Sequence, residues 1–357
     1  MPAPADNQPL VPEFDVLING ASIAAEVKTH VVGVTVDEHV DWPAMFTLAL
    51  IASEDLRDAH RWIDDAKLFA VGHEVEVKLG YANQLQSVLK GEITGLEPEY
   101  RADQLPALVV RGYDRLHRLL RGRKTRTFVN TKDSDIAARV AQEAGLSADV
   151  VDSSVTHDYV LQANQTDLDF LHERARRIQY EVAVADKTLH FRPVGNAESA
   201  AVTLALYDDV LEFYPRLSSV GQVSETGVRG WDAKSVKEIV GAGRKGDENS
   251  KMGGRATGAE LVAGPFGAAV GQTTAWPVKT QGEADQIAKA QLNRRLLELV
   301  EGEGVCRGRT DLRAGRVVKL DGAGARFSGQ YYLVAVVHRY HPQHSYQTRF
   351  TVRRNAA

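Results

Sequence analysis

The sequence predicts an α+β fold that is rich in β-structure, and three observations carry this prediction. Short runs of β-branched and aromatic residues, separated by turn residues, fill roughly the first hundred residues and the last fifty. Amphipathic helical patterns lie between these β-rich parts, over residues 134–144 and 166–178. A further helical pattern covers residues 283–300, shortly before the last β-rich stretch.

Composition places the chain among ordinary globular proteins. It has 357 residues, of which 43% are hydrophobic and 25% are charged, and this length predicts two or three domains. The formal net charge of −4 provides no basic field of the kind that attracts nucleic acid. The single cysteine, Cys306, rules out a disulfide framework within the chain, reads as a small core residue and fits a reducing cytoplasm.

The N-terminus reads as a frayed tail. It has neither the basic n-region nor the apolar h-region of a signal peptide. No stretch approaches the roughly 18 consecutive apolar residues of a membrane helix. We therefore expect a soluble protein without a membrane segment.

The first β-rich part contains many short strands, which is typical of a barrel or sandwich. Asn19 and Gly20 predict a hairpin turn, because both residues tolerate positive φ. Residues 54–66 are predicted as a short helix or loop. The predicted strands are 14–18, 31–36, 45–51, 74–79, 87–96 and 107–112.

The middle of the chain reads as a separate α+β unit. Ser134 is the predicted N-cap of the first helix, and Gly145 is its predicted C-terminal stop. The second helix begins at Thr166, with Asp169 at the capping-box position. Strands 180–184 and 189–191 then predict a small hairpin.

β-structure returns after this unit, at residues 202–206 and 227–240. Residues 241–282 have weak periodicity and many small residues, and we interpret them as a long loop or extended excursion. The helix over 283–300 follows, and the chain ends in a hairpin around His341 and Pro342.

The two β-rich parts share a short sequence pattern. Gly72-x-x-Val75-x-Val77 precedes Gly91-x-Ile93 in the first, and Gly315-x-x-Val318-x-Leu320 precedes Gly329-x-Tyr331 in the second. Both patterns predict strand, turn and strand. Either chance or an internal duplication accounts for the match, and duplication would give two similar barrels.

Two motifs that suggest chemistry have simpler explanations. Gly241, Gly243 and Gly246 match the dinucleotide fingerprint, but no helical pattern opens on them, so a flexible loop is the better interpretation. His338, His341 and His344 recur every third residue, and in a strand 338 and 344 share one face while 341 points away. No further ligand lies nearby in the sequence, so a polar hairpin face is favoured over a zinc site.

A basic run extends from Arg111 to Arg126, opposed locally only by Asp114. It could hold a phosphate backbone, but too few aromatic residues accompany it for a stacking platform. A solvated or protein-docking surface is the favoured interpretation.

Asp167 and Asp169 suit a helix N-terminus better than a glycosidase pair, because they point in different directions. The sequence therefore predicts no catalytic, cofactor-binding or metal-binding residues.

One segment carries a family resemblance. Residues 162–182, QANQTDLDFLHERARRIQYEV, with LHFRP at 189–193, resemble a hallmark of phage late control protein D and of the N-terminal part of VgrG spike proteins. VRGYD at 110–114, the stretch 312–334 and the terminal hairpin around 337–350 agree in the same order. The resemblance covers most of the chain from about residue 10 onward.

The resemblance implies two related antiparallel β-barrels of the tail-tube type that flank an α/β middle region. The implied organisation is listed here in chain order: a flexible tail over 1–12, a first barrel over 13–110, a middle domain over 111–200, the first part of a second barrel over 201–242, a loop-plus-helix excursion packing with the middle region over 243–302, and the second part of that barrel over 303–357.

The resemblance also implies a function. It predicts a non-enzymatic baseplate hub of a contractile phage tail or injection system, assembled in the bacterial cytoplasm, with no cofactor and no nucleic-acid binding. Three chains would form a ring that adapts the hexameric inner tube to a trimeric spike. VgrG chains continue into a needle, so we expect the spike to be a separate chain, and other baseplate proteins are further expected partners. The alternatives are a tail-associated peptidoglycan-degrading enzyme that uses the middle domain, and a nucleic-acid-binding module that uses the basic run.

Overall fold

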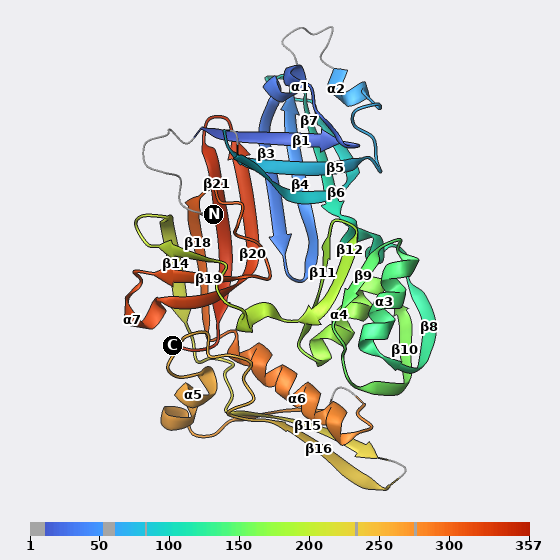
Figure 1. Cartoon of the computed structure of the whole chain (residues 1–357), viewed down its shortest axis with the longest axis vertical. Coiled ribbons are helices and arrows are strands. Elements are labelled where there is room, and N and C mark those ends of the chain that lie inside the picture. The colour runs from blue at the N-terminus through green and yellow to red at the C-terminus, as the bar shows by residue number, and fades with distance from the viewer. Residues whose placement is uncertain (1–10, 53–60, 83, 233–234, 275–276) are drawn as a thin grey trace.

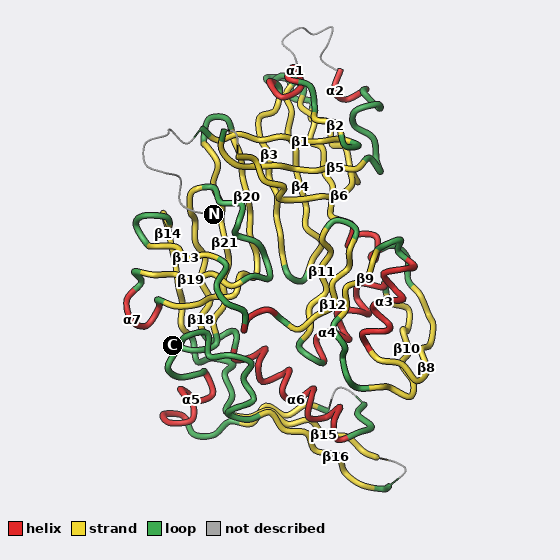
Figure 2. Tube along the Cα trace, viewed as in Figure 1, coloured by secondary structure: helices red, strands yellow, loops and turns green. Residues whose placement is uncertain are grey.

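The computed structural model describes residues 11–52, 61–82, 84–232, 235–274 and 277–357. It confirms the α+β, β-rich fold class, with long antiparallel ladders as the dominant structure. In Figure 1 one set of strands lies at the top and another at the left, while a compact α/β part lies at the right. Helix α6 (Gln281–Leu296) and a small sheet lie at the bottom, and Figure 2 shows the same division by secondary structure.

Thirteen strands of the described residues belong to one sheet. The first β region comprises β1 (Pro12–Ile18), β2 (Ala21–Ser22), β3 (Val31–His39), β4 (Trp42–Ile51), β5 (Glu74–Tyr81), β6 (Gln84–Glu99) and β7 (Ala107–Asp114). The second β region comprises β13 (Val202–Ala205), β14 (Val210–Leu217), β18 (Val300–Arg307), β19 (Val317–Asp321), β20 (Gly329–His341) and β21 (Ser345–Arg354).

The two β regions repeat one strand order. Neighbouring strands run β3-β4-β7-β6-β5 in the first and β14-β18-β21-β20-β19 in the second, with every pair antiparallel. The register repeats as well. Ile93 pairs with Gly112 and a bulge follows before Gly95, while Leu333 pairs with Val352 and a bulge follows before Ala335.

The hairpins that contain the shared sequence pattern follow this repeat, but the second half of the pattern is out of register. The Gly72 N–H donates to the Ile93 carbonyl, and the Gly315 N–H donates to the Leu333 carbonyl, each over 2.8 Å. Ile93 therefore corresponds to Leu333, and not to Tyr331 as the pattern suggests. The first half of the pattern is aligned correctly, and the second half is displaced by two residues.

Strand β20 joins the two β regions. Its first residues, Gly329–Tyr332, pair with β19, and residues 335–340 pair with β3 on the same side. The other side of β20 pairs with β21. Since β20 thus pairs with strands of both β regions, the two regions form one continuous hydrogen-bonded sheet.

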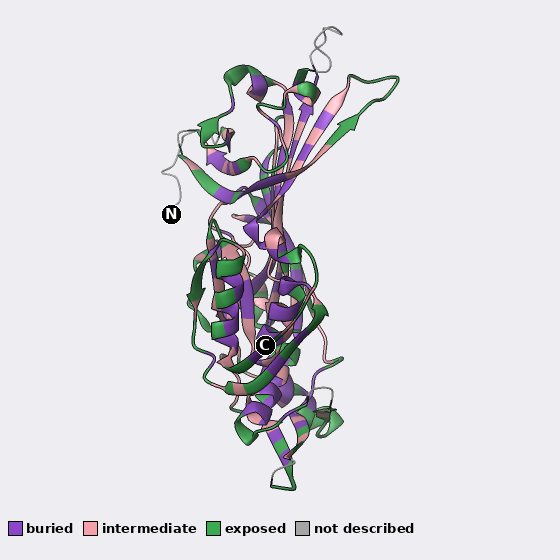
Figure 3. Ribbon diagram, turned by 90° about the vertical axis from the view of Figure 1, so that its right-hand side faces the viewer, coloured by how far each residue is buried: buried purple, intermediate pink, exposed green. Residues whose placement is uncertain are grey.

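Separate cores support the β regions. The first encloses Val16, Leu50 and Leu79 together with Tyr346 from β21, and another encloses Val318 and Phe350. Figure 3 shows buried residues along the centre of the molecule and exposed ones on its outer surface and at its ends. Burying a large aliphatic or aromatic side chain contributes about 1.5–3 kcal/mol, so these cores hold the sheet in its shape.

The middle region lies between β7 and β13 and has its own core. It comprises η1 (Arg115–Leu120), β8 (Lys124–Lys132), α3 (Asp133–Glu143), β9 (Ser147–Val150), β10 (Thr156–Gln165), α4 (Asp167–Arg177), β11 (Tyr180–Ala185), β12 (Thr188–Pro193) and η2 (Gly195–Ala197). β8 pairs with β10, and β11, β12 and β9 form a second small sheet.

Helix ends in the middle region agree with the sequence in part. The Thr166 hydroxyl accepts a hydrogen bond from the Asp169 N–H over 3.1 Å, which confirms the predicted cap of α4. Gly145 has φ +72°, which confirms the predicted end of α3. The predicted Ser134 cap is wrong, because the helix begins one residue earlier, at Asp133, after Lys132. The Ser134 hydroxyl instead accepts a bond from the Ser153 N–H.

An inserted segment separates β14 from β18. It comprises β15 (Glu225–Asp232), β16 (Lys237–Gly243), α5 (Gly258–Phe266), β17 (Val270–Thr273) and α6, and its three strands form a sheet that packs on α6. The predicted loop over 241–282 therefore also contains a short helix and a strand. The predicted helix end at Val300 is wrong, because α6 ends at Leu296 and Val300 begins β18.

The segment 201–242 spans two sheets. β13 and β14 lie in the large sheet, whereas β15 and β16 lie in the small sheet against α6.

The domain boundaries themselves remain predictions. The predicted tail lies largely outside the described residues, as do residues 54–60 of the predicted short helix or loop. The short helices are α1 (Ala25–Thr29), α2 (Arg61–Asp64) and α7 (Gly324–Phe327). None of the described helices is both long and apolar enough to cross a membrane.

Candidate functional site

The basic run does not form one open surface, because carboxylates from distant strands bind much of it. Arg115 is 2% exposed and forms ion pairs with Glu74 over 2.7 Å, Glu92 over 3.4 Å and Asp186 over 2.8 Å. Arg118 also binds Glu92. These pairs connect strands β5 and β6 to the β11–β12 turn. They tie the first β region to the middle region.

The end of the run is bound inside the middle region. Lys124 and Arg126 reach Asp167 at the start of α4 over 2.6 and 2.8 Å, and both also bind Glu143. The favoured sequence interpretation, a solvated or docking surface, is thus corrected for these residues. They are internal cross-links, and the acids that neutralise them are too distant in sequence to have been assigned as partners.

A second junction holds the two β regions together. Glu38 on β3 is 6% exposed and accepts hydrogen bonds from Arg313 Nε over 2.6 Å and the Ala314 N–H over 3.1 Å. Arg313 also donates to the Val88 carbonyl over 2.8 Å. Burial raises the pKa of Glu38, while Arg313 favours its charged form. The loop before β19 is thereby fixed to the first β region.

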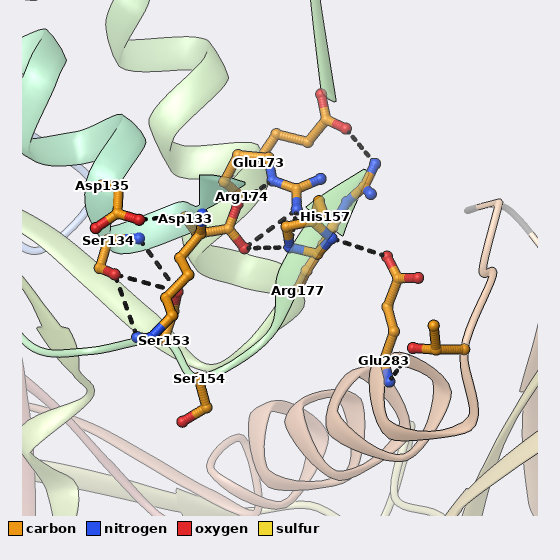
Figure 4. Close-up of polar contacts among 12 residues, drawn as sticks. Asp133, Ser134, Asp135, Ser153, Ser154, His157, Glu173, Arg174, Arg177 and Glu283 are labelled. Carbon is orange, nitrogen blue, oxygen red and sulfur yellow. Dashed lines mark hydrogen bonds and ion pairs between the residues drawn. The ribbon is translucent and has the colours of Figure 1, made fainter. Parts of the chain in front are cut away.

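The larger pocket, of about 300 Å³, lies between β10, α4 and the start of α6. Arg174 binds both oxygens of Asp133, over 2.5 and 3.1 Å, and its Nη2 lies 2.8 Å from His157 Nε2 (Figure 4). His157 Nε2 therefore accepts this bond, and Nδ1 faces Glu283 at 3.7 Å. Burial would raise the pKa of Asp133, but the positive charge and the hydrogen bonds of Arg174 hold it below its usual value.

Three of the polar side chains at this pocket, Arg174, His157 and Glu283, are engaged in contacts. Glu283 also accepts a hydrogen bond from the Lys279 backbone N–H over 3.1 Å. A general acid of a glycosidase needs a raised pKa and a free proton, and Asp133 has the opposite environment. The arrangement suits a structural connection between α3, α4 and α6.

A smaller pocket, of about 120 Å³, lies between β20, α4 and α6. The Tyr332 hydroxyl donates to Glu181 over 2.6 Å, and Arg192 pairs with the same carboxylate over 2.9 Å. Burial lowers the pKa of His172 to about 4, so this imidazole is neutral at physiological pH. These contacts attach the sheet to the middle region and to α6.

The three histidines separate in the structure. His338 is fully buried, where Nδ1 lies 3.2 Å from Thr348 Oγ1 and 2.9 Å from the Tyr346 hydroxyl. His341 and His344 lie ring to ring at the hairpin turn, with centroids 4.6 Å apart. β20 ends at His341 and β21 begins at Ser345, which confirms the predicted hairpin around His341 and Pro342. No group of three metal-binding side chains gathers within the described ranges.

The remaining predicted features have structural roles. Cys306 is buried, which raises the pKa of its thiol to about 12, and this confirms its interpretation as a core residue. Gly241 and Gly243 lie in β16 and allow close contact with α6. A Cβ atom at Gly241 would lie 2.2 Å from the Ala284 main chain. The flexible-loop interpretation is wrong for these two glycines.

Solved structures of phage tail proteins have the same fold. The structure matches the 43 kDa tail protein of prophage MuSo2 from Shewanella oneidensis with a TM-score of 0.70 and 14% identity, over 96% of this chain and 98% of the other. A tail protein from Neisseria meningitidis matches with a TM-score of 0.69 and 12% identity, over 96% of each chain.

A third match comes from an Escherichia coli component of the type VI secretion system, described as structurally similar to the phage T4 tail proteins gp27 and gp5. It has a TM-score of 0.62 and 15% identity, over 96% of this chain and 77% of the other. At these identities the likeness establishes the fold, which is that of phage tail proteins.

The family is given by a separate match. The family model described as the Alg8 N-terminal domain matches residues 8–341, and the chain belongs to this family. No match was found among curated proteins.

Proposed function

We propose that the chain is a structural hub of a contractile tail or related injection system, in the manner of phage late control protein D and the N-terminal part of VgrG. Three copies would form a ring between the hexameric inner tube and a trimeric spike. The repeated sheet is the observation that carries this proposal. Each chain holds two β regions with one strand order and one register, so three chains would present six similar units around an axis.

The full-length likeness to phage tail proteins and to a type VI secretion component supports the proposal. The spike, the inner tube protein and other baseplate proteins are the partners that we infer. The domain division is part of the proposal. We retain a first barrel over 13–110, a middle domain over 111–200 and a second barrel whose parts, 201–242 and 303–357, flank the excursion.

The proposed mechanism is geometric. A continuous sheet through β20 and β3 would transmit the contraction force between the two units of each chain. The ion pairs at Arg115 and the buried pair of Glu38 with Arg313 would keep the middle region and the sheet from shifting under that force.

We infer a non-enzymatic role. The peptidoglycan-degrading alternative would need free catalytic carboxylates in the middle domain, and Asp133, beside the larger pocket, is instead held in a two-point pair with Arg174. Incubation of the purified chain with peptidoglycan tests this inference. Release of soluble muropeptides would overturn it.

Light scattering of the purified chain, alone and with its candidate spike protein, tests the ring. We expect the mass of a trimer, either at once or after the spike is added. A monomer mass under both conditions, at every concentration measured, would rule out the ring and leave only the fold.

A further inference from the structure

Two of the unpaired edges of the large sheet in the described residues correspond to the two strands that meet inside the chain. β14 pairs only with β18, and the end of β6, residues 95–99, pairs only with β7. By the repeated strand order, β14 takes the position of β3, and β6 takes the position of β20. Inside the chain, β3 and β20 pair with each other.

The correspondence is residue by residue. The shared bulge places Gly95 of β6 at the position of Ala335 in β20. For the other strand, Val34 of β3 pairs with a residue of β4 that in turn pairs with Val110 of β7. In the same way, Phe213 of β14 pairs with a residue of β18 that in turn pairs with Phe350 of β21. The repeated register places Val110 and Phe350 at equivalent positions. Phe213 therefore occupies the position of Val34.

We propose that these edges form the contact between copies of the chain, with β14 of one copy beside the end of β6 of the next, in the register of the β3–β20 pair. The proposal rests on the ring proposed above and specifies its interface. Tyr340 faces Val34 and Arg339 faces Thr35 inside the chain. Transferred to the contact, Glu99 lies opposite Tyr214.

Charge complementarity supports this partner and this register. The same register brings Arg216 opposite Glu97 and Glu212 opposite Arg101, so each ionic pair combines opposite signs. Glu97 and Arg101 pair within the chain with Arg111 over 2.8 Å and with Glu99 over 3.3 Å, but their side chains remain 53% and 59% exposed. Arg216 is also exposed, and it has no ion pair within the part of the chain that the structure describes. Its neighbour on β18, Glu301, binds Arg353 over 3.1 Å instead.

Two prolines would meet at the centre of the contact. Pro98 occupies the position of His338 and Pro215 that of Val36, a pair that lies face to face inside the chain. Alternate residues of a strand direct their backbone N–H groups to alternate sides. In this register, the backbone nitrogens of Pro98 and Pro215 both face the free edges, where an N–H group would donate across the contact. The contact would therefore lack both N–H donors of its central pair, and would be weaker than the β3–β20 ladder.

This weakness has a function in assembly. Complementary edges on one chain are a head-to-tail interface, which gives either a closed ring or an open filament. Edge prolines limit uncontrolled strand pairing. The contact would then form on a template such as the spike or the tube, and not between free chains at low concentration.

Disulfide trapping tests the register. Positions 99 and 214 flank the proline pair and form a non-hydrogen-bonded pair, with Cα atoms about 4.5 Å apart, within reach of a disulfide. We expect oxidation of full-length chain carrying Glu99→Cys and Tyr214→Cys, with its candidate spike, to give covalent dimers and trimers and nothing larger. The matched control, Glu99→Cys with Glu212→Cys, places the thiols diagonally, at about 7–8 Å, and should not cross-link.

A charge exchange tests the side chains. Arg216→Glu or Glu97→Arg should each weaken association by about fivefold per contact, and the combined variant should restore it. Arg229→Glu, an exposed change on the small sheet, should have no effect. A trimer mass without the 99–214 cross-link would overturn this interface and leave the hub intact. A monomer mass at all concentrations, with the spike protein present as well as without it, would overturn the ring, and the interface with it.

Discussion

His338 lies on β20 where the two β regions meet, opposite Val36 of β3, as a buried neutral imidazole. Burial lowers its pKa to about 3, whereas an unfolded histidine titrates near 6.5. As the pH falls below about 6.5, the His338 imidazole is protonated in the unfolded chain but stays neutral in the folded chain. His338 therefore contributes stability above pH 6.5 that is lost progressively as the pH falls toward 3.

We expect the difference in unfolding free energy between wild type and His338→Gln to narrow by about 2 kcal/mol between pH 7 and pH 5. Denaturant titrations at both pH values measure it. His344→Ala, an exposed change at the turn, should track the wild type, and should also leave assembly unchanged. Parallel pH profiles for His338→Gln and wild type would show that the site is not proton-linked.

The pair of Glu38 with Arg313 is the second test at this scale. Arg313→Met leaves a buried carboxylate without its cation and should cost about 2 kcal/mol of stability. Glu38→Leu combined with Arg313→Met removes both charges and should cost less than Arg313→Met alone. Chemical denaturation of the three proteins gives the coupling, and additive losses would mean that the pair does not act as a unit.

At the scale of elements, β16 depends on its glycines to approach α6. Gly241→Ala brings a Cβ atom against the Ala284 main chain and should destabilise the inserted segment by about 3 kcal/mol. Hydrogen exchange of the α6 amides should rise in this variant. Gly282→Ala, in α6 itself with nothing within 4 Å, should leave exchange unchanged or slower. Unchanged exchange in Gly241→Ala would refute the packing argument.

Local signals in the sequence predicted local structure well. The Thr166 cap, the Gly145 stop and the hairpin at Asp186 follow from side-chain and φ preferences within a few residues. Strands β8 and β10 were not predicted, and for β8 the reason is that it begins inside the basic run, whose charge dominated the interpretation. The β16 glycines needed a partner, Ala284, that only the tertiary structure supplies.

The candidate site was harder to predict than the elements. The acids that bind Arg115 lie on three separate turns or strands, and residue spacing does not specify such partners. The period-two pattern of β20 predicts a strand, but it does not state that one half pairs with β19 and the other with β3.

At the scale of the whole molecule, the second β region must be complete for assembly. Val318 is fully buried in β19 and pairs with Val202 on one side and Tyr331 on the other. Val318→Pro removes a ladder donor and should abolish assembly into particles, as counted by electron microscopy. Val318→Ala keeps the N–H group and should assemble at reduced yield. Normal particles from Val318→Pro would contradict a load-carrying sheet.

The pairing of β20 with β3 also has a consequence for biosynthesis. His39 finds its ladder partner at Ala335, near the end of the chain, so β3 leaves the ribosome long before the strand that covers it. During translation the first β region carries an open edge that the finished protein no longer has. Neighbouring nascent chains on one messenger could fill it with each other's β20, so slow late folding and exchanged dimers are the expected failures when this protein is overproduced.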